Sequence, residues 1–578
     1  MSEHVEAPGV AGTPVDRRRF VAYFGALGLS GTLFPGTLWA LAQQRPVTKE
    51  MIAEAEAIAD VQFTDAQREE MLEGLNANVK AFELIHQTPL ANGVEPATAF
   101  DAVLPGMTVP MSRKPIFRPG RPTGVKRPAR LEEVAFWPVF RLAELVRTRQ
   151  VKPSELVELY LARLKQHGPT LEAVIELTEP RARAQAAQLD GEIAAGHYRG
   201  PLHGIPWGAK DLLATKGYRT TWGAAPYKDQ RIEEDAEVVK RLDAAGAVLV
   251  AKLTLGALAQ GDVWYGGQTK NPWNLKQGSS GSSAGPAAAT AAGLVGFAIG
   301  SETLGSIVSP STRCGCSGLR PTFGRVPRTG AMALSWSMDK LGPLCRAAED
   351  CALVLNAIQG PDGRDPHMHE AAFDWDAGTK LSQLRIGYLK SAFEATERHP
   401  TKAYDDAVLD VLRAQGAMLK PFEWPDFPAL PALRSAILSA EAAASFDELT
   451  RSGRDQLMTA QGKGDWPNVF RVARFVPAVE YINANRIRTQ LMAATYDAMK
   501  DVDVVVSPSF GGATLLLTNL TGNPTAVVPS GFTPEGTPVS ISFVGQLWGE
   551  AAALAAAKAY QEATSWNTRV PPLFAPTA

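Results

Sequence analysis

Residues 278–319 read GSSGSSAGPAAATAAGLVGFAIGSETLGSIVSPSTRCGCSGL, and the interpretation of the whole chain depends on this stretch. Glycine, serine and alanine dominate it, and only Glu302 and Arg313 carry charge. Glycine permits positive φ angles, and small residues let two backbone segments approach closely. Successive free N–H groups can form an anion-binding concavity. The stretch is therefore suited to holding a serine and stabilising an oxyanion.

The composition of the chain limits the classes of function. With 578 residues, 45% hydrophobic and 20% charged, it is expected to fold around a large core. A formal net charge of -2 provides no basic field that would attract nucleic acid. Four cysteines and eight histidines show no spacing typical of a zinc site. We therefore expect buried or half-buried thiols, no metal, no cofactor and no nucleic-acid partner; the oligomeric state is left open.

Residues 1–42 resemble a twin-arginine export signal. Arg17 and Arg18 precede an apolar run that ends in Ala-Leu-Ala at Ala42. The alternative is a membrane anchor, because residues 20–42 are long enough to span a bilayer. Glycines and a Pro-Gly pair within the run disfavour a permanent helix. We expect cleavage after Ala42 and an exported protein, periplasmic or secreted, that meets the membrane only through this signal.

Residues 43–130 are predicted to form a helical extension and a linker. The pattern from 51 to 86 is helical and contains a capping box, Thr64-x-x-Gln67. One face of this pattern carries the apolar residues Met71, Leu75, Val79 and Phe82. We expect a helical cap that packs on the main domain. Residues 105–130 are rich in proline and basic residues but poor in aromatics, which favours a solvated connector over a nucleic-acid site.

From residue 131 to 578 helical patterns alternate with short apolar runs. Residues 153–165 are helical in pattern, and the apolar runs include 247–251, 386–389 and 502–506. Such alternation is typical of an α/β layer structure.

Two serine-enzyme motifs are disfavoured by what surrounds them. Residues 281–285 fit the G-x-S-x-G elbow with Ser283 as nucleophile, which requires a histidine further along the chain. Only three histidines follow Ser283, all before residue 400. Ser337-x-x-Lys340 matches the S-x-x-K of β-lactamases, but neither S-D-N nor K-T-G accompanies it.

A third set of motifs needs no histidine. Residues 204–211 (GIPWGAKD), the serine-rich run after Gly278, and residues 300–306 (GSETLGS) together resemble the amidase signature family of serine hydrolases. Further blocks occur in the expected order: NPW at 271–273, GLRPTFGRV at 318–326, DKLGP at 339–343, SP at 507–508 and GNP at 522–524. The resemblance extends over about residues 131–565. It implies one α/β amidase-signature domain, 131–578, with a mixed central sheet flanked by helices.

The resemblance also implies a Ser-cis-Ser-Lys triad. Lys210 is the proton acceptor, Ser282 the bridging serine after a cis peptide bond from Gly281, and Ser306 the nucleophile. The backbone N–H groups of the oxyanion hole are those of Thr303, Leu304, Gly305 and Ser306. Ala259, Trp207 and Trp336 are candidates for the lining of the substrate pocket, and core packing is the alternative for each of the two tryptophans.

The chemistry of a lysine base leads to a physical expectation. Only a neutral amine can take a proton from serine, so the pKa of Lys210 must fall from about 10.4 toward about 7. Burial among apolar groups such as Ile205, Pro206 and Trp207 would lower it. The expected reaction is hydrolysis of a small-molecule amide through an acyl-enzyme, which releases ammonia or an amine. An ester or carbamate hydrolase and an inactive ligand-binding relative are the alternatives.

The motif departs from the family pattern at three positions. Glu302 replaces the usual Asp, Leu304 replaces Gly, and Val308 replaces the Arg that follows the nucleophile. Arg313 is close enough in sequence to be a replacement partner for Glu302, which we state as a hypothesis. Intracellular members of the family act as one component of a tRNA-dependent amidotransferase, and an exported single chain does not fit that role.

Overall fold

The computed structural model describes residues 46–59, 61–88, 100–103, 107–111, 116–395 and 401–576. The export signal expected at 1–42 lies outside these ranges. The described chain forms two compact units, one up to Lys80 and one from Ala81 onward. In the described ranges, every helix is too short or too polar to cross a bilayer.

The described chain begins with two helices where the sequence suggested one continuous pattern, and the second of them crosses from the first unit into the second. Helix α3 spans Lys49–Ala59 and helix α4 spans Asp65–Gln87. The predicted capping box lies at the start of α4: the Thr64 N–H donates to Gln67 Oε1 at 2.8 Å, and the Gln67 N–H donates to Thr64 Oγ1 at 3.3 Å. Both bonds satisfy N–H groups that a helix start leaves without partners. The capping box is confirmed, and the packing of these helices on the main domain stays a prediction.

The second unit is built on an eleven-stranded sheet with the order β14-β13-β15-β17-β16-β10-β11-β9-β3-β4-β2. Strands β3, β4 and β9 run parallel, as do β13, β14 and β15, whereas the strands between these two groups pair antiparallel. The sheet is therefore mixed, as expected. The strand bounds are β2 Val174–Leu177, β3 Pro206–Lys210, β4 Val248–Leu253, β9 Phe297–Glu302, β10 Ser317–Arg320, β11 Lys340–Cys345, β13 Ile386–Leu389, β14 Leu419–Phe422, β15 Val504–Pro508, β16 Thr525–Phe532 and β17 Pro538–Gly545.

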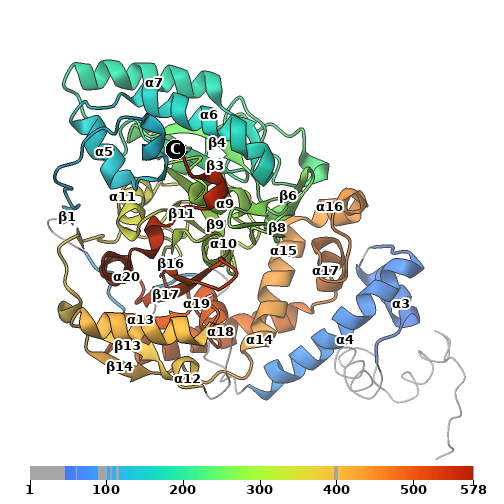
Figure 1. Ribbon diagram of the computed structural model, residues 1–578. Coiled ribbons are helices and arrows are strands. Elements are labelled where there is room, and N and C mark those ends of the chain that lie inside the picture. The colour runs from blue at the N-terminus through green and yellow to red at the C-terminus, as the bar shows by residue number, and fades with distance from the viewer. Residues whose placement is uncertain are drawn as a thin grey trace, which may run out of the picture. The chain divides into compact units, whose positions relative to one another are not determined.

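Helices flank this sheet, and α11 and α20 lie beside its central strands (Figure 1). Their bounds, with those of other helices of this unit, are α5 Val139–Arg147, α6 Pro153–Leu171, α7 Glu179–Ala194, α8 Glu237–Ala244, α11 Ala348–Ile358, α13 Lys402–Ala414, α15 Ser439–Ser445, α17 Trp466–Ala473, α18 Ala478–Ala498 and α20 Glu550–Thr564. The helices nearest the site are α9 Ala284–Ala291, α10 Val308–Cys314 and α19 Thr514–Thr521. The predicted α/β layers are confirmed.

The small residues of the central stretch allow helix α9 to lie directly against the sheet. A Cβ atom added at Gly300 on β9 would lie 2.5 Å from Ser283 Oγ, and one at Gly285 would lie 2.5 Å from the Thr254 nitrogen. Real Cβ atoms do not approach other atoms this closely, so glycine is required at both positions. The composition that marked this stretch in the sequence is thus explained by close packing at the centre of the fold.

The linker expected to be a solvated connector is in part attached to the main unit. Strand β1 (Phe117–Arg118) pairs in parallel with β12 (Trp375–Asp376). The Gly120 N–H donates to Glu349 Oε1 at 2.6 Å, and Arg127 pairs with Glu155 at 2.7 Å. Residues 116–130 are all half-buried or exposed, as a solvated connector requires, while backbone pairing and ion pairs hold them against residues far away in the sequence.

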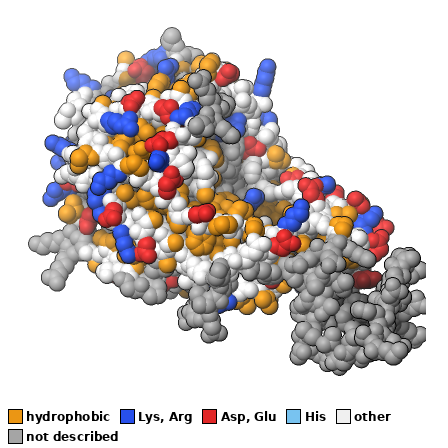
Figure 2. All heavy atoms as spheres, turned by 90° about the horizontal axis from the view of Figure 1, so that it is seen from below, with side chains coloured by type: hydrophobic (Ala, Val, Ile, Leu, Met, Phe, Trp, Pro, Cys, Tyr) orange, Lys and Arg blue, Asp and Glu red, His pale blue; other side chains and the backbone are white. Residues whose placement is uncertain are grey.

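Surface charges of both signs are interspersed. Figure 2 shows blue and red side chains mixed around a central hydrophobic area on one face. The four cysteines, by contrast, are all buried and unpaired, as the sequence predicted.

Candidate active site

Lys210 ends strand β3 and lies at the centre of a group of serine hydroxyls. Its Nζ atom is 2.8 Å from Ser282 Oγ, 3.1 Å from Ser283 Oγ and 2.9 Å from Ser301 Oγ. The side chain is completely buried. Burial lowers the pKa of Lys210 to about 7, although Asp339 and Glu302 act in the opposite direction. The burial of Lys210 in this site is therefore the physical reason to expect a neutral amine.

Ser282 follows a cis peptide bond from Gly281, as expected. A Cβ atom at Gly281 would lie 1.7 Å from the Gly261 carbonyl oxygen, so only glycine fits there. The N–H of the next residue, Ser283, donates to the Ser306 carbonyl at 3.1 Å. This bond brings the backbone of Ser306 next to Ser282, and the Ser306 side chain is buried with 8% of its surface exposed.

The loop 303–306 joins β9 to helix α10 and carries the predicted oxyanion-hole residues. Gly305 has a φ angle of 85°, a conformation that glycine adopts without strain. Within the described ranges, the N–H groups of Leu304, Gly305 and Ser306 donate to no protein acceptor. Free N–H groups in one tight loop are the arrangement needed to bind a developing oxyanion.

Glu302 holds the far side of this loop in place. Its Oε2 atom accepts the N–H groups of Ile307 at 2.8 Å and Val308 at 3.0 Å. Its Oε1 atom accepts from Arg320 Nη1 and Asn519 Nδ2, both at 2.8 Å. Burial would raise the pKa of Glu302, but Arg320 and these hydrogen bonds lower it to about 2. Glu302 is therefore a paired carboxylate.

The hypothesis that Arg313 pairs with Glu302 is wrong. Arg313 donates to Gln277 Oε1 at 3.2 Å instead. Arg320 is the partner of Glu302, since β10 and β9 both pair with β11 and bring these two buried side chains together. The positive charge beside Glu302 is thus supplied by strand β10, which β11 separates from β9 in the sheet.

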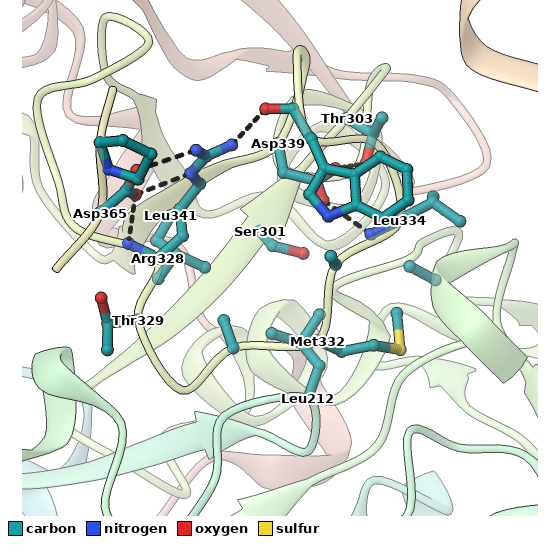
Figure 3. A pocket seen from close by; sticks show the side chains of 15 residues that line it. Leu212, Ser301, Thr303, Arg328, Thr329, Met332, Leu334, Asp339, Leu341 and Asp365 are labelled. Carbon is teal, nitrogen blue, oxygen red and sulfur yellow. Dashed lines mark hydrogen bonds and ion pairs between the residues drawn. The ribbon is translucent and has the colours of Figure 1, made fainter. Parts of the chain in front are cut away.

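A pocket of about 190 Å³ lies beside this site. Figure 3 shows Ser301 and Thr303 on its wall, with Leu212 and Met332 facing the same space. Ala259 and Trp336, two of the three residues expected to line a pocket, do so. The remaining apolar side chains on the wall include Leu334 and Leu341.

Trp207 does not line this pocket. Its side chain is fully buried in β3, and its ring stacks on Phe297 with centroids 6.0 Å apart. The two residues are direct neighbours in the pairing of β3 with β9. The expectation of a substrate-binding role for Trp207 is therefore corrected to a role in core packing.

The S-x-x-K motif does not form a catalytic pair. Ser337 Oγ donates to Glu441 Oε1 at 2.7 Å and accepts from Arg488 at 2.8 Å. Within the described residues, Lys340 Nζ has no hydrogen-bond partner. Ser337 is thus a structural hydroxyl.

Two contacts of the site were missed from the sequence. Ser301 reaches Lys210, and Asp339 accepts a hydrogen bond from Thr303 Oγ1 at 2.5 Å. Both residues lie in blocks that resemble the family, but only the strand pairing brings them to the lysine and the loop. Within the described residues, no group of three or more His, Cys, Asp or Glu side chains is arranged to hold a metal ion.

Both the sequence and the fold are similar to those of known proteins. The family model Amidase matches residues 155–518. A glutamyl-tRNA(Gln) amidotransferase subunit of Roseiflexus castenholzii is 34% identical over 476 residues, covering 75% of this chain and 97% of the relative. A putative amidase, AmiD, of Mycobacterium bovis is 32% identical over 492 residues, covering 77% and 98%. The structure of native peptide amidase from Stenotrophomonas maltophilia is similar with a TM-score of 0.66 and 30% identity, over 75% of this chain and 98% of that one. The chain belongs to the amidase family, whose structural neighbours here are amidase-signature enzymes.

Proposed function

We propose that this chain hydrolyses a carboxylic amide with Ser306 as nucleophile, through an acyl-enzyme, and releases ammonia or an amine. The observation that carries the proposal is the buried Lys210 amine, 2.8 Å from Ser282 Oγ, beside a loop with free N–H groups. Membership of the amidase family supports the hydrolysis of amides in general. The serine mechanism is our inference from the contacts.

The proton moves along the three residues in both directions. Neutral Lys210 takes the proton of Ser282 Oγ, Ser282 takes that of Ser306, and Ser306 Oγ attacks the amide carbonyl. The free N–H groups of the 303–306 loop stabilise the oxyanion, an effect worth about 2.7–4 kcal/mol per donor. When the C–N bond breaks, Lys210 returns the proton through Ser282 to the leaving amine. Water then attacks the acyl group by the same route and regenerates Ser306.

A fluorophosphonate serine probe tests the nucleophile. We expect labelling of the wild-type chain at Ser306 and none of Ser306→Ala, while Ser337→Ala serves as the control that still reacts. A folded wild-type protein that takes no label would favour an inactive ligand-binding relative. Amides, esters and carbamates of one acid, assayed side by side, decide which bond is cleaved.

A second candidate function follows from the names of the relatives. Several are glutamyl-tRNA(Gln) amidotransferase subunits, and the first is 34% identical over 97% of its length. Such a role requires partner proteins, whereas the first proposal requires none. If the purified chain alone releases ammonia from simple amides, the first proposal stands; release from glutamine only when partner proteins are added would favour the second.

We also propose that residues 1–42 direct export of the chain. The support is the twin arginine at Arg17 and Arg18 and the Ala-Leu-Ala sequence that ends at Ala42.

A further inference from the structure

The pocket beside Ser301 contains charged side chains, but each is already occupied by a protein partner. Arg328 donates from Nε to Asp365 Oδ2 at 2.9 Å and from Nη2 to Asp365 Oδ1 at 3.0 Å. Its Nη1 atom donates to the Trp336 carbonyl at 2.6 Å. Figure 3 shows Arg328 and Asp365 bound to each other at one side of the space. A bidentate arginine–carboxylate pair of this kind satisfies both charges.

Asp339, the other charged residue of the wall, is occupied in the same way. One oxygen accepts from Thr303 Oγ1 at 2.5 Å, and the other accepts the N–H groups of Leu334 at 2.7 Å and Ser335 at 3.0 Å. The Arg328–Asp365 pair therefore offers no unpaired positive charge to a ligand, and the oxygens of Asp339 are already engaged by neutral protein donors. An anionic group entering this pocket would lose its water without gaining an unpaired positive charge, which is unfavourable.

The rest of the wall is apolar. Leu212, Met332, Leu334 and Leu341 form most of it, and the small side chains of Ala259 and Ala333 leave room between them. The volume of about 190 Å³ exceeds the roughly 150 Å³ of an apolar cavity that holds benzene. A single ring with a small substituent therefore fits within these walls, whereas a long alkyl chain would extend beyond them.

Trp336 provides a flat surface with a fixed backbone at the pocket. Its carbonyl is held by Arg328, and the following residue, Ser337, is held through its N–H and hydroxyl by Glu441. The Trp336 side chain is 47% exposed, so its ring is available to a ligand. Aromatic rings prefer offset-stacked or edge-to-face contact with other rings.

We propose that this pocket binds the acyl group of the substrate and selects small, uncharged aryl or similarly compact apolar carboxamides, with Trp336 as a specificity-determining residue. The inference rests on the proposed amide hydrolysis, since it names the substrate class of that same site. This substrate preference would distinguish the chain from an enzyme that acts on glutamine, whose acyl part carries an ammonium and a carboxylate group.

An isosteric pair of substrates tests the role of charge. 4-Nitrobenzamide and 4-carbamoylbenzoate have nearly the same shape, but only the second is anionic. We expect kcat/KM to be at least about 100-fold higher for the nitro compound. Hexadecanamide and glutamine are expected to be turned over more slowly than either benzamide or its nitro derivative. Equal or faster turnover of the carboxylate or of glutamine would overturn the inference and leave the proposed hydrolysis intact.

Trp336→Ala tests the aromatic surface. We expect kcat/KM for benzamide to fall about tenfold, while that for acetamide, which is too small to reach the ring, falls much less. Met418→Ala is the matched control, because Met418 is 74% exposed and does not line the pocket. Equal losses on benzamide and acetamide would contradict a specificity role for Trp336.

Binding to Ser306→Ala separates this inference from the proposed function. Titration with 4-nitrobenzamide, followed by quenching of tryptophan fluorescence, should give a Kd at least about tenfold below that of 4-carbamoylbenzoate. Selective binding together with absence of turnover by the wild-type enzyme would overturn the proposed hydrolysis and support the pocket. Turnover of amides without preferential binding of the neutral aryl compound would overturn the inference about the pocket and support the proposed hydrolysis.

Discussion

Replacement of Lys210 by methionine should remove activity without destabilising the protein at pH 7. The lysine is fully buried, and its pKa is lowered from 10.5 to about 7. Methionine has a similar length and no amine to desolvate. The unfolded chain, by contrast, keeps an ordinary lysine that binds its proton up to a pH of about 10.5.

The depressed pKa sets the size and sign of the effect. Between pH 7 and 10.5 the unfolded wild-type chain binds a proton that the folded site refuses, so burial of Lys210 lowers the stability of the wild type there. A pKa difference of 3.5, at 1.36 kcal/mol per unit, lowers the free energy of unfolding of the wild type by about 5 kcal/mol well below pH 7. The loss is about 4 kcal/mol at pH 7 and about 1 kcal/mol at pH 9.5. The penalty disappears above pH 10.5.

The hydrogen bonds of Lys210 act in the opposite direction. Three serine hydroxyls contact its amine, and a typical net value is about 1 kcal/mol for each bond. The free energy of unfolding of Lys210→Met should therefore be about 1 kcal/mol higher than that of the wild type at pH 7 and about 2 kcal/mol lower at pH 9.5. Urea unfolding at the two pH values measures this reversal.

Lys252→Met is the matched control. Lys252 is equally buried, but it forms an ion pair with the buried Asp211 at 3.2 Å. Removing one partner of such a pair costs about 3–5 kcal/mol, so this variant should be clearly destabilised at pH 7. If Lys210→Met behaved like Lys252→Met and showed no pH-dependent reversal, Lys210 would be a charged structural residue and another base would be required.

The remaining predictions concern rate, register and export. We expect kcat/KM to rise about tenfold per pH unit below pH 7 and then level, because only neutral Lys210 accepts the proton; a profile flat from pH 5 to 9 would contradict this. Ser282→Ala should lower kcat by about 1000-fold or more. Ser283→Ala should lower kcat by less than about tenfold and lower the free energy of unfolding by about 1 kcal/mol, because its bonds to β9 are lost. A larger loss of kcat in Ser283→Ala than in Ser282→Ala would place the bridging serine at 283. Replacing Arg17 and Arg18 by lysine should leave the precursor in the cytoplasm, and N-terminal sequencing of the exported wild type should begin near Gln43; an uncleaved, membrane-bound wild type would support the anchor instead.

Local patterns in the sequence predicted local structure well. The capping box of Thr64 and Gln67 involves residues three apart, so its hydrogen bonds depend only on the start of one helix. The apolar run 386–389 coincides with strand β13, since a short buried strand needs only a continuous apolar segment. The contact between Lys210 and Ser282 could also be predicted, because both residues lie in blocks that resemble the amidase signature family.

Contacts between segments far apart in the chain could not be predicted in this way. Arg313 is nearer than Arg320 to Glu302 in sequence, yet it lies in helix α10 and binds Gln277. Arg320 reaches Glu302 because of the order of strands in the sheet, which no local pattern contains.

The alternation of helical and apolar segments was enough to predict the α/β class, and the resemblance of short motifs to the amidase signature family selected the serines and the lysine of the candidate site. They were not enough to tell Trp207, which stacks on Phe297 in the core, from Trp336, which lies at the pocket. Both residues are tryptophans close to family motifs, and their sequence surroundings do not distinguish them. The tertiary structure does distinguish them. The register of β3 against β9 sets Trp207 opposite a buried phenylalanine, whereas Trp336 lies in the segment between β10 and β11, where Arg328 holds its carbonyl.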